Sequence, residues 1–211
     1  MFIRVPGPLE SIYGVVTRNA EEVAWPEFDV GFYEVKDVTG RVTDPISDAV
    51  NMVSCFGDSA AAESNPELVP VSDAGDRATR EQPYFDWSYV CPSRREYADE
   101  VLDVIAACAG ENTAVRLDDV GFPREAYCRC DTCEARFEDS GESDWREWRS
   151  SVITEFVAEA VELIPGRVYF TLYPDPYPGH LYRRAGIDID AIASLVDEFV
   201  VPLYDMAYET T

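Results

Sequence analysis

Three cysteines lie within six residues of this sequence, in the segment Cys128-Arg129-Cys130-Asp131-Thr132-Cys133. C-x-C and C-x-x-C spacings let one turn aim several thiolates at one centre, and four thiolates complete a closed tetrahedral zinc site without an open catalytic position. We expect Cys91, just before Pro92, to be the fourth ligand. The alternatives are a redox or free-thiol role for the cluster and a small buried hydrophobic residue for Cys91. The spacing favours structural Zn²⁺.

Acidic and aromatic residues follow the predicted strands and could form a second site. These residues are Asp118, Asp119, Tyr173, Asp175, Asp205 and Tyr208. Glycoside hydrolysis usually needs two carboxyls, about 5 Å apart for retention or roughly 6.5–9.5 Å apart for inversion. One carboxyl must stay protonated near neutral pH through burial or a neighbouring negative charge. Adjacent Asp118 and Asp119 should point to opposite sides of an extended strand, so we do not expect them to be the pair.

Strands and helices alternate along the chain. The predicted strands are Ile12–Thr17, Val30–Val35, Asn51–Phe56, Thr113–Val120, Val168–Tyr173 and one within Phe199–Tyr208. The predicted helices are 94–109, capped by Ser93, a second from Ser143 or Asp144 to about Ile164, and Ile189–Val196. Residues 57–92 read as a long irregular loop, a length that is uncommon without a function. This alternation predicts βαβ units with a parallel sheet.

The predicted fold is an α/β, TIM-barrel-like fold that is incomplete, with about six strands in a single domain spanning 1–211. A complete barrel typically needs about 250 residues, and the chain has 211. Within the domain we expect a Cys-rich zinc loop at 124–142. Chemistry in such barrels lies at the carboxyl ends of the strands, where the acids listed above are expected.

The net charge limits the partners of this protein. Asp and Glu number 41 against 17 Lys and Arg, which gives −24, and Lys36 is the only lysine. Molar salt shortens the Debye length to about 3 Å and screens the resulting repulsion, so the composition favours a haloarchaeal-type, high-salt cytoplasm. The alternative is an acidic partner-binding surface. Nucleic acid is excluded as a partner, because phosphates require basic patches.

We expect a cytoplasmic location. No apolar run reaches about 18 residues, which predicts no membrane span, and the start MFIRVPGPLE lacks the pattern of a signal peptide. In a reducing compartment the six cysteines favour metal binding or free thiols over disulfides. Cys55 and Cys108 read as ordinary buried thiols, and the single histidine, His180, is a poor candidate ligand.

The cysteines and their surroundings resemble a known family. The run Cys91-Pro92-Ser93, a Tyr-containing helix, a strand ending in an acid, and Cys-x-Cys-x-x-Cys with Phe137 and Trp145 are similar to the zinc-bearing family 42 β-galactosidases. The phrase Leu117-Asp118-Asp119-Val120-Gly121-Phe122-Pro123 also resembles a strand of uncharacterised glycosidase-like barrel families, as do the segments 185–197 and 201–204. The resemblance covers roughly residues 65 to 208.

The resemblance implies roles for particular acids. The family's Asn-Glu at the end of the fourth strand corresponds to Asp118-Asp119 here, so Asp119 would be the acid/base and Asp118 its substrate-binding neighbour. The family's nucleophile follows the seventh strand, which has no counterpart, and Asp205 is the best substitute, with Glu209 behind it. The alternative for each acid is an ordinary strand-end or solvated carboxylate. The missing counterpart of the nucleophile leaves three explanations. The chain is a fragment, a barrel completed by a partner subunit in a homo-oligomer, or a relative without catalysis.

Aromatic side chains near the predicted rim could stack on a sugar. Tyr173, Asp175 and Tyr208 are the predicted substrate contacts, and further rings are Tyr84, Phe85, Trp87, Tyr89, Tyr177 and Tyr182. Ordinary aromatic packing is the alternative for each ring, and Trp145 and Trp148 at helical spacing are expected in the core. Two hypotheses follow: a zinc-containing glycoside hydrolase acting on a carbohydrate, and a non-catalytic carbohydrate-binding or structural barrel.

Overall fold

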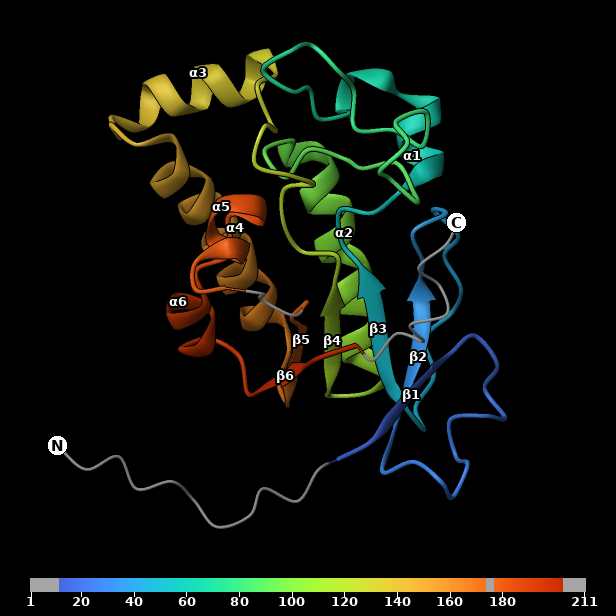
Figure 1. Ribbon diagram of the computed structural model, residues 1–211. Helices are drawn as coiled ribbons and strands as arrows, with labels where there is room; N and C mark the ends of the chain where they lie inside the picture. The colour runs from blue at the N-terminus through green and yellow to red at the C-terminus, as the bar shows by residue number, and fades with distance from the viewer. Residues whose placement is uncertain (1–11, 174–176, 203–211) are drawn as a thin grey trace, which may run out of the picture.

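Six parallel strands form one sheet in the computed structural model, which describes residues 12–173 and 177–202 (Figure 1). The strands follow one another in sequence order across the sheet, and each pairs in parallel with the next. They are β1 (Gly14–Thr17), β2 (Val30–Lys36), β3 (Val50–Ser54), β4 (Val115–Asp118), β5 (Val168–Thr171) and β6 (Glu198–Val200). This order is that of an incomplete TIM-barrel-like fold, and the predicted fold class is confirmed.

Helices cover one face of this sheet, with α2 and α4 packed against each other and α2 packed against β3 and β4. The helical segments are α1 (Ser59–Ser64), η1 (Pro66–Leu68), α2 (Arg95–Glu111), α3 (Asp131–Ser140), α4 (Trp145–Leu163), α5 (His180–Ala185) and α6 (Ile189–Ala193). The core between helices and sheet is fully buried and largely aliphatic, with Val53, Ile105, Val115, Leu117, Ile153, Val157 and Phe170 at its centre. Its burial is the main driving force for this arrangement.

The opposite face of the sheet is concave. The paired residues Met52–Arg116 and Ser54–Asp118 lie on this face, because they alternate with the core residues Val53 and Leu117 along the strands. A hollow of about 620 Å³ on this side is lined from both edge strands, including Gly14, Val16, Phe32, Arg116, Tyr169 and Val200. The hollow corresponds to the interior of a barrel that is not closed by these strands.

Three regions differ from the sequence-based prediction. The loop predicted at 57–92 contains α1 and η1, because the carboxylate of Asp58 accepts the Ala61 backbone N–H at 2.8 Å and Asn65 caps the second turn. The Cys-rich loop at 124–142 contains α3, which ends at Gly141 in the left-handed conformation. Residues 180–185 form α5, a helix that the sequence did not predict.

Several predicted boundaries also shift. Arg94, not Ser93, occupies the N-cap of α2, and no side chain caps that helix. The cap of α4 is Asp144, one of the two predicted residues, whose carboxylate accepts the N–H groups of Arg146 and Glu147. The third strand ends at Ser54 and the last begins at Glu198, while positions 203–208 of the last predicted strand lie outside the described residues. Among the described residues, no helix combines the length and apolar character needed to cross a membrane.

Candidate metal centre and carboxylate site

Cys91, Cys128, Cys130 and Cys133 converge on one point of the structure. Their Sγ atoms all lie within 4.8 Å of one another, and Cys91 Sγ lies 3.3 Å from Cys133 Sγ and 4.0 Å from Cys130 Sγ. A tetrahedral centre with Zn–S bonds of about 2.3 Å would place its sulfurs about 3.8 Å apart. The four thiols therefore have the spacing and donor type of a closed four-thiolate metal site.

Two chain segments deliver these four thiols. Cys91 precedes α2 and is anchored by its backbone N–H to the Leu68 carbonyl at 2.8 Å. Cys130 is the N-cap of α3 and Cys133 lies in its first turn, where the helix dipole favours negative charge. Cys128 Sγ accepts the Val71 N–H at 3.4 Å. The cluster thus joins the 57–92 segment to α3.

The remaining cysteines behave as the sequence predicted. Cys55 and Cys108 are fully buried free thiols outside the cluster, and burial raises the pKa of Cys108 to about 12. Within the cluster the shifts run in both directions: hydrogen bonds from neighbouring thiols, Cys128 first among them, lower the pKa of Cys130, whereas those from Cys128 and Cys130 raise the pKa of Cys133. Metal binding requires the thiolate form of each ligand.

Asp119 follows the carboxyl end of β4, and its backbone does not continue the extended conformation in which successive side chains alternate between the two faces of the sheet. Its φ of 49° is in the left-handed region, which Asp adopts more readily than most residues. Its Oδ2 accepts a hydrogen bond from Ser54 Oγ at 2.9 Å, and its Oδ1 accepts one from the Tyr173 hydroxyl at 3.0 Å. The expectation of two opposed carboxylates therefore does not hold, because Asp119 is not in the extended conformation that the alternation rule requires.

Burial changes the acidity of Asp119. The side chain is almost completely enclosed, and this loss of solvation raises its pKa to about 7. The negative charge of Asp118 adds to the rise, while the hydrogen bonds from Ser54 and Tyr173 and the charge of Lys36 oppose it. A carboxyl that titrates near neutrality can hold or release a proton at ordinary pH, which suits a general acid or base.

Asp118 occupies the concave face beside this carboxyl. It pairs across the sheet with Ser54, and its Oδ1 lies 3.9 Å from the guanidinium of the buried Arg116. Arg116 in turn donates from Nε to Thr171 Oγ1 at 3.0 Å. The structure therefore brings together Asp118, Asp119 and Tyr173 from the predicted site. Asp175, Asp205 and Tyr208 lie outside the described residues.

A small cavity of about 50 Å³ borders Asp119. It lies between the loop after β4 and α5, and Tyr89, Phe122, Tyr173, Leu181 and Arg184 contribute to its walls. Of the rings predicted near the rim, Tyr89 and Tyr173 thus lie beside the carboxyl. Trp148 is buried, as predicted for a core residue, and Trp145, which is only partly buried, packs against it with ring centroids 4.7 Å apart.

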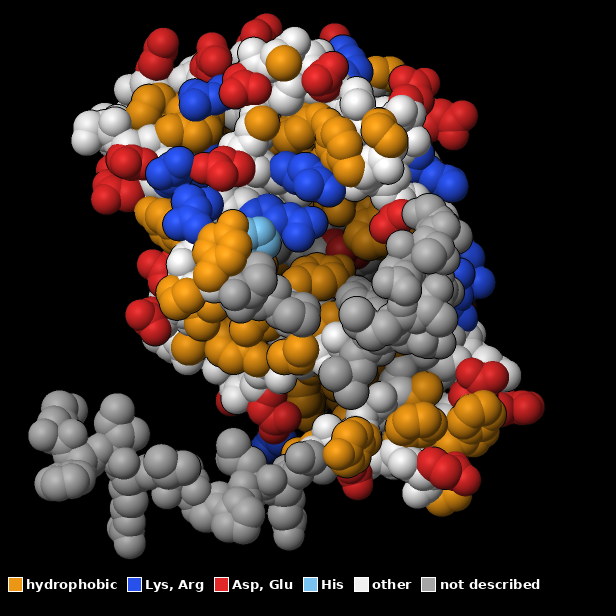
Figure 2. Space-filling model, viewed as in Figure 1, with side chains coloured by type: hydrophobic (Ala, Val, Ile, Leu, Met, Phe, Trp, Pro, Cys, Tyr) orange, Lys and Arg blue, Asp and Glu red, His pale blue; other side chains and the backbone are white. Residues whose placement is uncertain are grey.

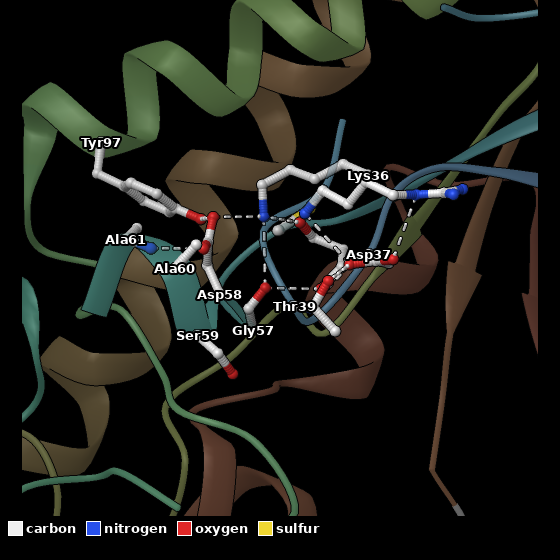
Figure 3. A network of polar contacts seen from close by, with 12 residues as sticks. Lys36, Asp37, Thr39, Gly57, Asp58, Ser59, Ala60, Ala61 and Tyr97 are labelled. Carbon is white, nitrogen blue, oxygen red and sulfur yellow. Dashed lines mark hydrogen bonds and ion pairs between the residues drawn. The ribbon is translucent and has the colours of Figure 1, made fainter. Parts of the chain in front are cut away.

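The sequence analysis missed the network that supports Ser54. Lys36 Nζ lies 3.0 Å from Asp58 Oδ2 and donates to the Ser54 carbonyl at 3.0 Å (Figure 3). The Tyr97 hydroxyl donates to the same Asp58 oxygen at 2.8 Å. Lys36 and Asp58 are both buried, so the pair is shielded from solvent. The isolation of Lys36 as the only lysine was the available signal.

Glu34 is a second carboxyl that the sequence analysis did not select. It lies on β2 opposite Met52, and its Oε2 is 2.5 Å from Arg18 Nε. Burial raises its pKa, opposed by Arg18 and reinforced by Asp37 and Asp118. The sequence does contain a signal for Glu34, which is an acid within the predicted strand Val30–Val35. Alternate residues of a strand face the same side of the sheet, so an acid there can face the interior of the barrel.

Comparison with known proteins gives structural neighbours but no sequence match. No protein-family model matches the chain, and no curated protein sequence matches it. The glycoside hydrolase domain of PgaB (BpsB) from Bordetella bronchiseptica aligns with a TM-score of 0.58 and 13% identity over 72% of this chain. Alpha-L-fucosidase isoenzyme 2 from Paenibacillus thiaminolyticus aligns with a TM-score of 0.52 and 16% identity over 68% of it.

A hypothetical protein from Ruminiclostridium thermocellum also shares the fold, with a TM-score of 0.52 and 16% identity over 74% of this chain and 94% of its own. The alignments span only 50% of the PgaB domain structure and 27% of the fucosidase. At these identities the likeness establishes the fold. Two of these three neighbours are glycoside hydrolases, and this chain matches part of each.

Proposed function

We propose that this protein is a glycoside hydrolase-like barrel in which Asp119 is the acid/base residue. The observation that carries the proposal is a buried carboxyl with a pKa of about 7 at the carboxyl end of β4, bordering a cavity. In barrels of this kind that end of the sheet carries the active site. The glycoside hydrolase neighbours and the resemblance to family 42 β-galactosidases support the same assignment.

The reaction needs a second carboxyl beside Asp119. Asp205, at the end of the chain's predicted last strand, remains the candidate from the sequence. Among the described residues, Glu34 is an alternative, because it lies on the same side of the sheet as Asp118 and its pKa is raised by burial. Asp118 and Tyr173 would contact the sugar, and Asp175 and Tyr208 remain predicted contacts.

The metal in the four-cysteine cluster is proposed to be structural zinc. Cys91, Cys128, Cys130 and Cys133 would occupy all four positions of a tetrahedral ion, so the ion would bind no substrate. Its role is to hold the segment before α2 against α3. Cys128 lies nine residues after Asp119 in the chain. A metal bound at Cys128 would therefore also restrain the end of the loop that starts at Asp119.

The setting of the protein is part of the same proposal. The chain would form a single domain spanning 1–211. A second subunit that covers the open face of the sheet would complete the barrel. The excess of acids and the single lysine support a haloarchaeal-type, high-salt cytoplasm.

A non-catalytic carbohydrate-binding barrel is the second candidate. The cavity beside Asp119 is about 50 Å³, whereas pockets that bind small molecules usually measure about 300–1,000 Å³. A site this small would have to open, or be completed by another segment, before a sugar could enter it.

A panel of chromogenic glycosides at high salt separates these candidates. We expect turnover by the wild type, and a loss of about a hundredfold or more in kcat for Asp119→Asn, as is typical when a general acid or base is removed. Asp103→Asn, which changes an exposed acid of α2, is the matched control. Unchanged turnover in Asp119→Asn would refute the site assignment. Sugar binding without turnover by any variant would favour the second candidate.

A further inference from the structure

A basic hollow of about 320 Å³ lies next to the Asp119 site. Its walls include Arg124, Arg183, Arg184 and His180, together with Glu125, Ala126 and Tyr177. Figure 2 shows Lys and Arg side chains gathered around the histidine on this face of the molecule. Such a concentration of positive charge is unexpected by chance in a chain with a net charge of −24.

The arginines of this hollow have no ion-pair partner among the acids that the structure describes. Within residues 12–173 and 177–202, no Asp or Glu forms an ion pair with Arg124, Arg183 or Arg184. Glu125, the carboxylate among the described wall residues, is already engaged by Arg146 at 2.6 Å. The hollow therefore presents excess positive charge, although the chain has 41 acids available for pairing.

A buried arginine holds these three residues in place through their backbones. Arg149 is completely buried and donates to the carbonyl oxygens of Arg183 at 2.8 Å, Arg184 at 2.9 Å and Arg124 at 3.0 Å. The first two carbonyls belong to the last turn of α5, where a cation is electrostatically favourable. Arg149 thus fixes the loop after β4 to α5 through these backbone carbonyls. The Arg124 guanidinium also donates from Nη2 to the Tyr84 carbonyl at 3.0 Å, and the Arg183 guanidinium lies over the Tyr177 ring, 5.3 Å from its centroid.

The basic hollow adjoins the carboxylate site. Arg184 lines both the hollow and the small cavity beside Asp119. The charges of Asp119, Arg184 and Arg124 all act on the pKa of Tyr89 in that cavity: Asp119 raises it, and the two arginines lower it. A ligand that places its neutral sugar ring near Asp119 would therefore bring an attached acidic group to these arginines.

We propose that the basic hollow binds the carboxylate, sulfate or phosphate group of an anionic carbohydrate. Guanidinium groups bind such oxyanions through paired, charge-assisted hydrogen bonds, and Arg124, Arg183 and Arg184 supply three of them. Nucleic acid is a poorer fit, because the acidic remainder of the protein would repel its continuous phosphate backbone. This inference rests on the proposed function, and it specifies the substrate class of the same site.

Calorimetric binding distinguishes this proposal from the catalytic one. The probes are an oligogalacturonate and its methyl-esterified form, with a sulfated and a phosphorylated glucose to identify the preferred acidic group. We expect the wild type to bind at least one anionic probe about tenfold or more tighter than the neutral ester. The preference should shrink between about 0.1 M and about 1 M NaCl, as the Debye length falls from about 10 Å to about 3 Å.

Two variants identify the residues responsible. The double variant Arg183→Gln/Arg184→Gln should lose about 10- to 100-fold in affinity for the anionic probe, because each removes a charged donor. Its fold should persist, since Arg149 binds the backbone at these positions. Arg124→Gln provides an independent second test. Arg167→Gln, which changes an exposed arginine at the opposite end of β5, is the matched control.

The outcomes separate the two proposals. Asp119→Asn should retain anionic binding, so anionic binding without turnover would support the basic hollow and leave only the catalytic proposal in doubt. Equal affinity for anionic and neutral probes would overturn the inference, even if neutral glycosides were hydrolysed. Anionic binding that survives both the double variant and Arg124→Gln would overturn it as well.

Discussion

The cysteine cluster and the Asp119 site stand at the two ends of one chain segment, residues 119–133, yet they are built in different ways. Three of the four cysteines come from six consecutive residues, and all four are buried. Asp119 instead depends on hydroxyls from two other parts of the sheet, Ser54 and Tyr173. Local spacing defines the first site, whereas tertiary packing defines the second.

The two sites also manage buried charge differently. A bound cation would offset the charge of thiolates in the cluster, so their burial need not be unfavourable. Asp119 has only two neutral donors and the more distant Lys36 against its negative charge, so burial raises its pKa to about 7. We therefore expect the metal centre to stabilise the fold and the carboxylate site to destabilise it at high pH.

Loss of the metal should have the largest effect. In Cys130→Ser we expect loss of the bound zinc and a decrease in unfolding free energy of more than about 5 kcal/mol, because metal binding contributes directly to folding. For a domain of this size that corresponds to a fall in Tm of about 10–20 °C or more. Elemental analysis and calorimetry measure both. Cys108→Ala, at a buried thiol outside the cluster, should keep the metal; a wild type without metal would contradict the assignment.

Removal of the buried lysine should be the next largest effect. Lys36→Met leaves Asp58 buried without its cation, which typically costs about 3–5 kcal/mol. Chemical denaturation measures this loss, and the metal content should not change. The double variant Lys36→Met/Asp58→Asn should recover part of the stability. No recovery would mean that Lys36 acts through its carbonyl contacts to Ser54 and Gly57 and not through Asp58.

Asp119→Asn should stabilise the protein at high pH. The native carboxyl has a pKa of about 7 against an ordinary value of 3.8, so it favours the folded state while protonated and loses that contribution as pH rises from about 4 to about 7. The full shift corresponds to about 4 kcal/mol, and we expect roughly half to be recovered because the hydroxyl donors remain. Asn also tolerates the left-handed backbone.

Urea denaturation of the wild type and Asp119→Asn from about pH 3 to about pH 8 measures the effect. The difference between them should vanish near about pH 3, where the wild-type carboxyl is largely protonated in both the folded and the unfolded state. A constant difference at every pH would show that Asp119 does not titrate in this range. Asp103→Asn should show no such pH dependence, because Asp103 is exposed on α2.

The smallest expected effect is on the acidity of Asp119 itself. Ser54→Ala removes a hydrogen bond that favours the ionised carboxyl, so the pKa of Asp119 should rise by about one unit. Carboxyl NMR of the labelled protein, or the pH profile of any glycosidase activity, measures this shift. A fall in pKa would show that Ser54 mainly stabilises the protonated form.

The sequence predicted the fold class and the cysteines of the candidate metal centre for a common physical reason. Alternating strand and helix patterns such as Val168–Tyr173 and the helix from Asp144 are local, and the pairing of parallel strands in order follows from them. Cys128, Cys130 and Cys133 are neighbours in the chain, so their convergence needed little tertiary information. Short helices such as α1 and α5 were missed, because a helix of one or two turns carries almost no periodic signal.

Local patterns in the sequence were enough to predict the parallel α/β order, the acidic composition and the four thiols that cluster as a candidate metal centre. Only the tertiary structure determined the conformation of Asp119, its contacts with Ser54 and Tyr173, and the support of Ser54 by Lys36. It also brought Arg124, Arg183 and Arg184 together around the buried Arg149. The physical reason is that pKa shifts and charged hollows arise from burial and from residues distant in sequence, which local spacing cannot encode.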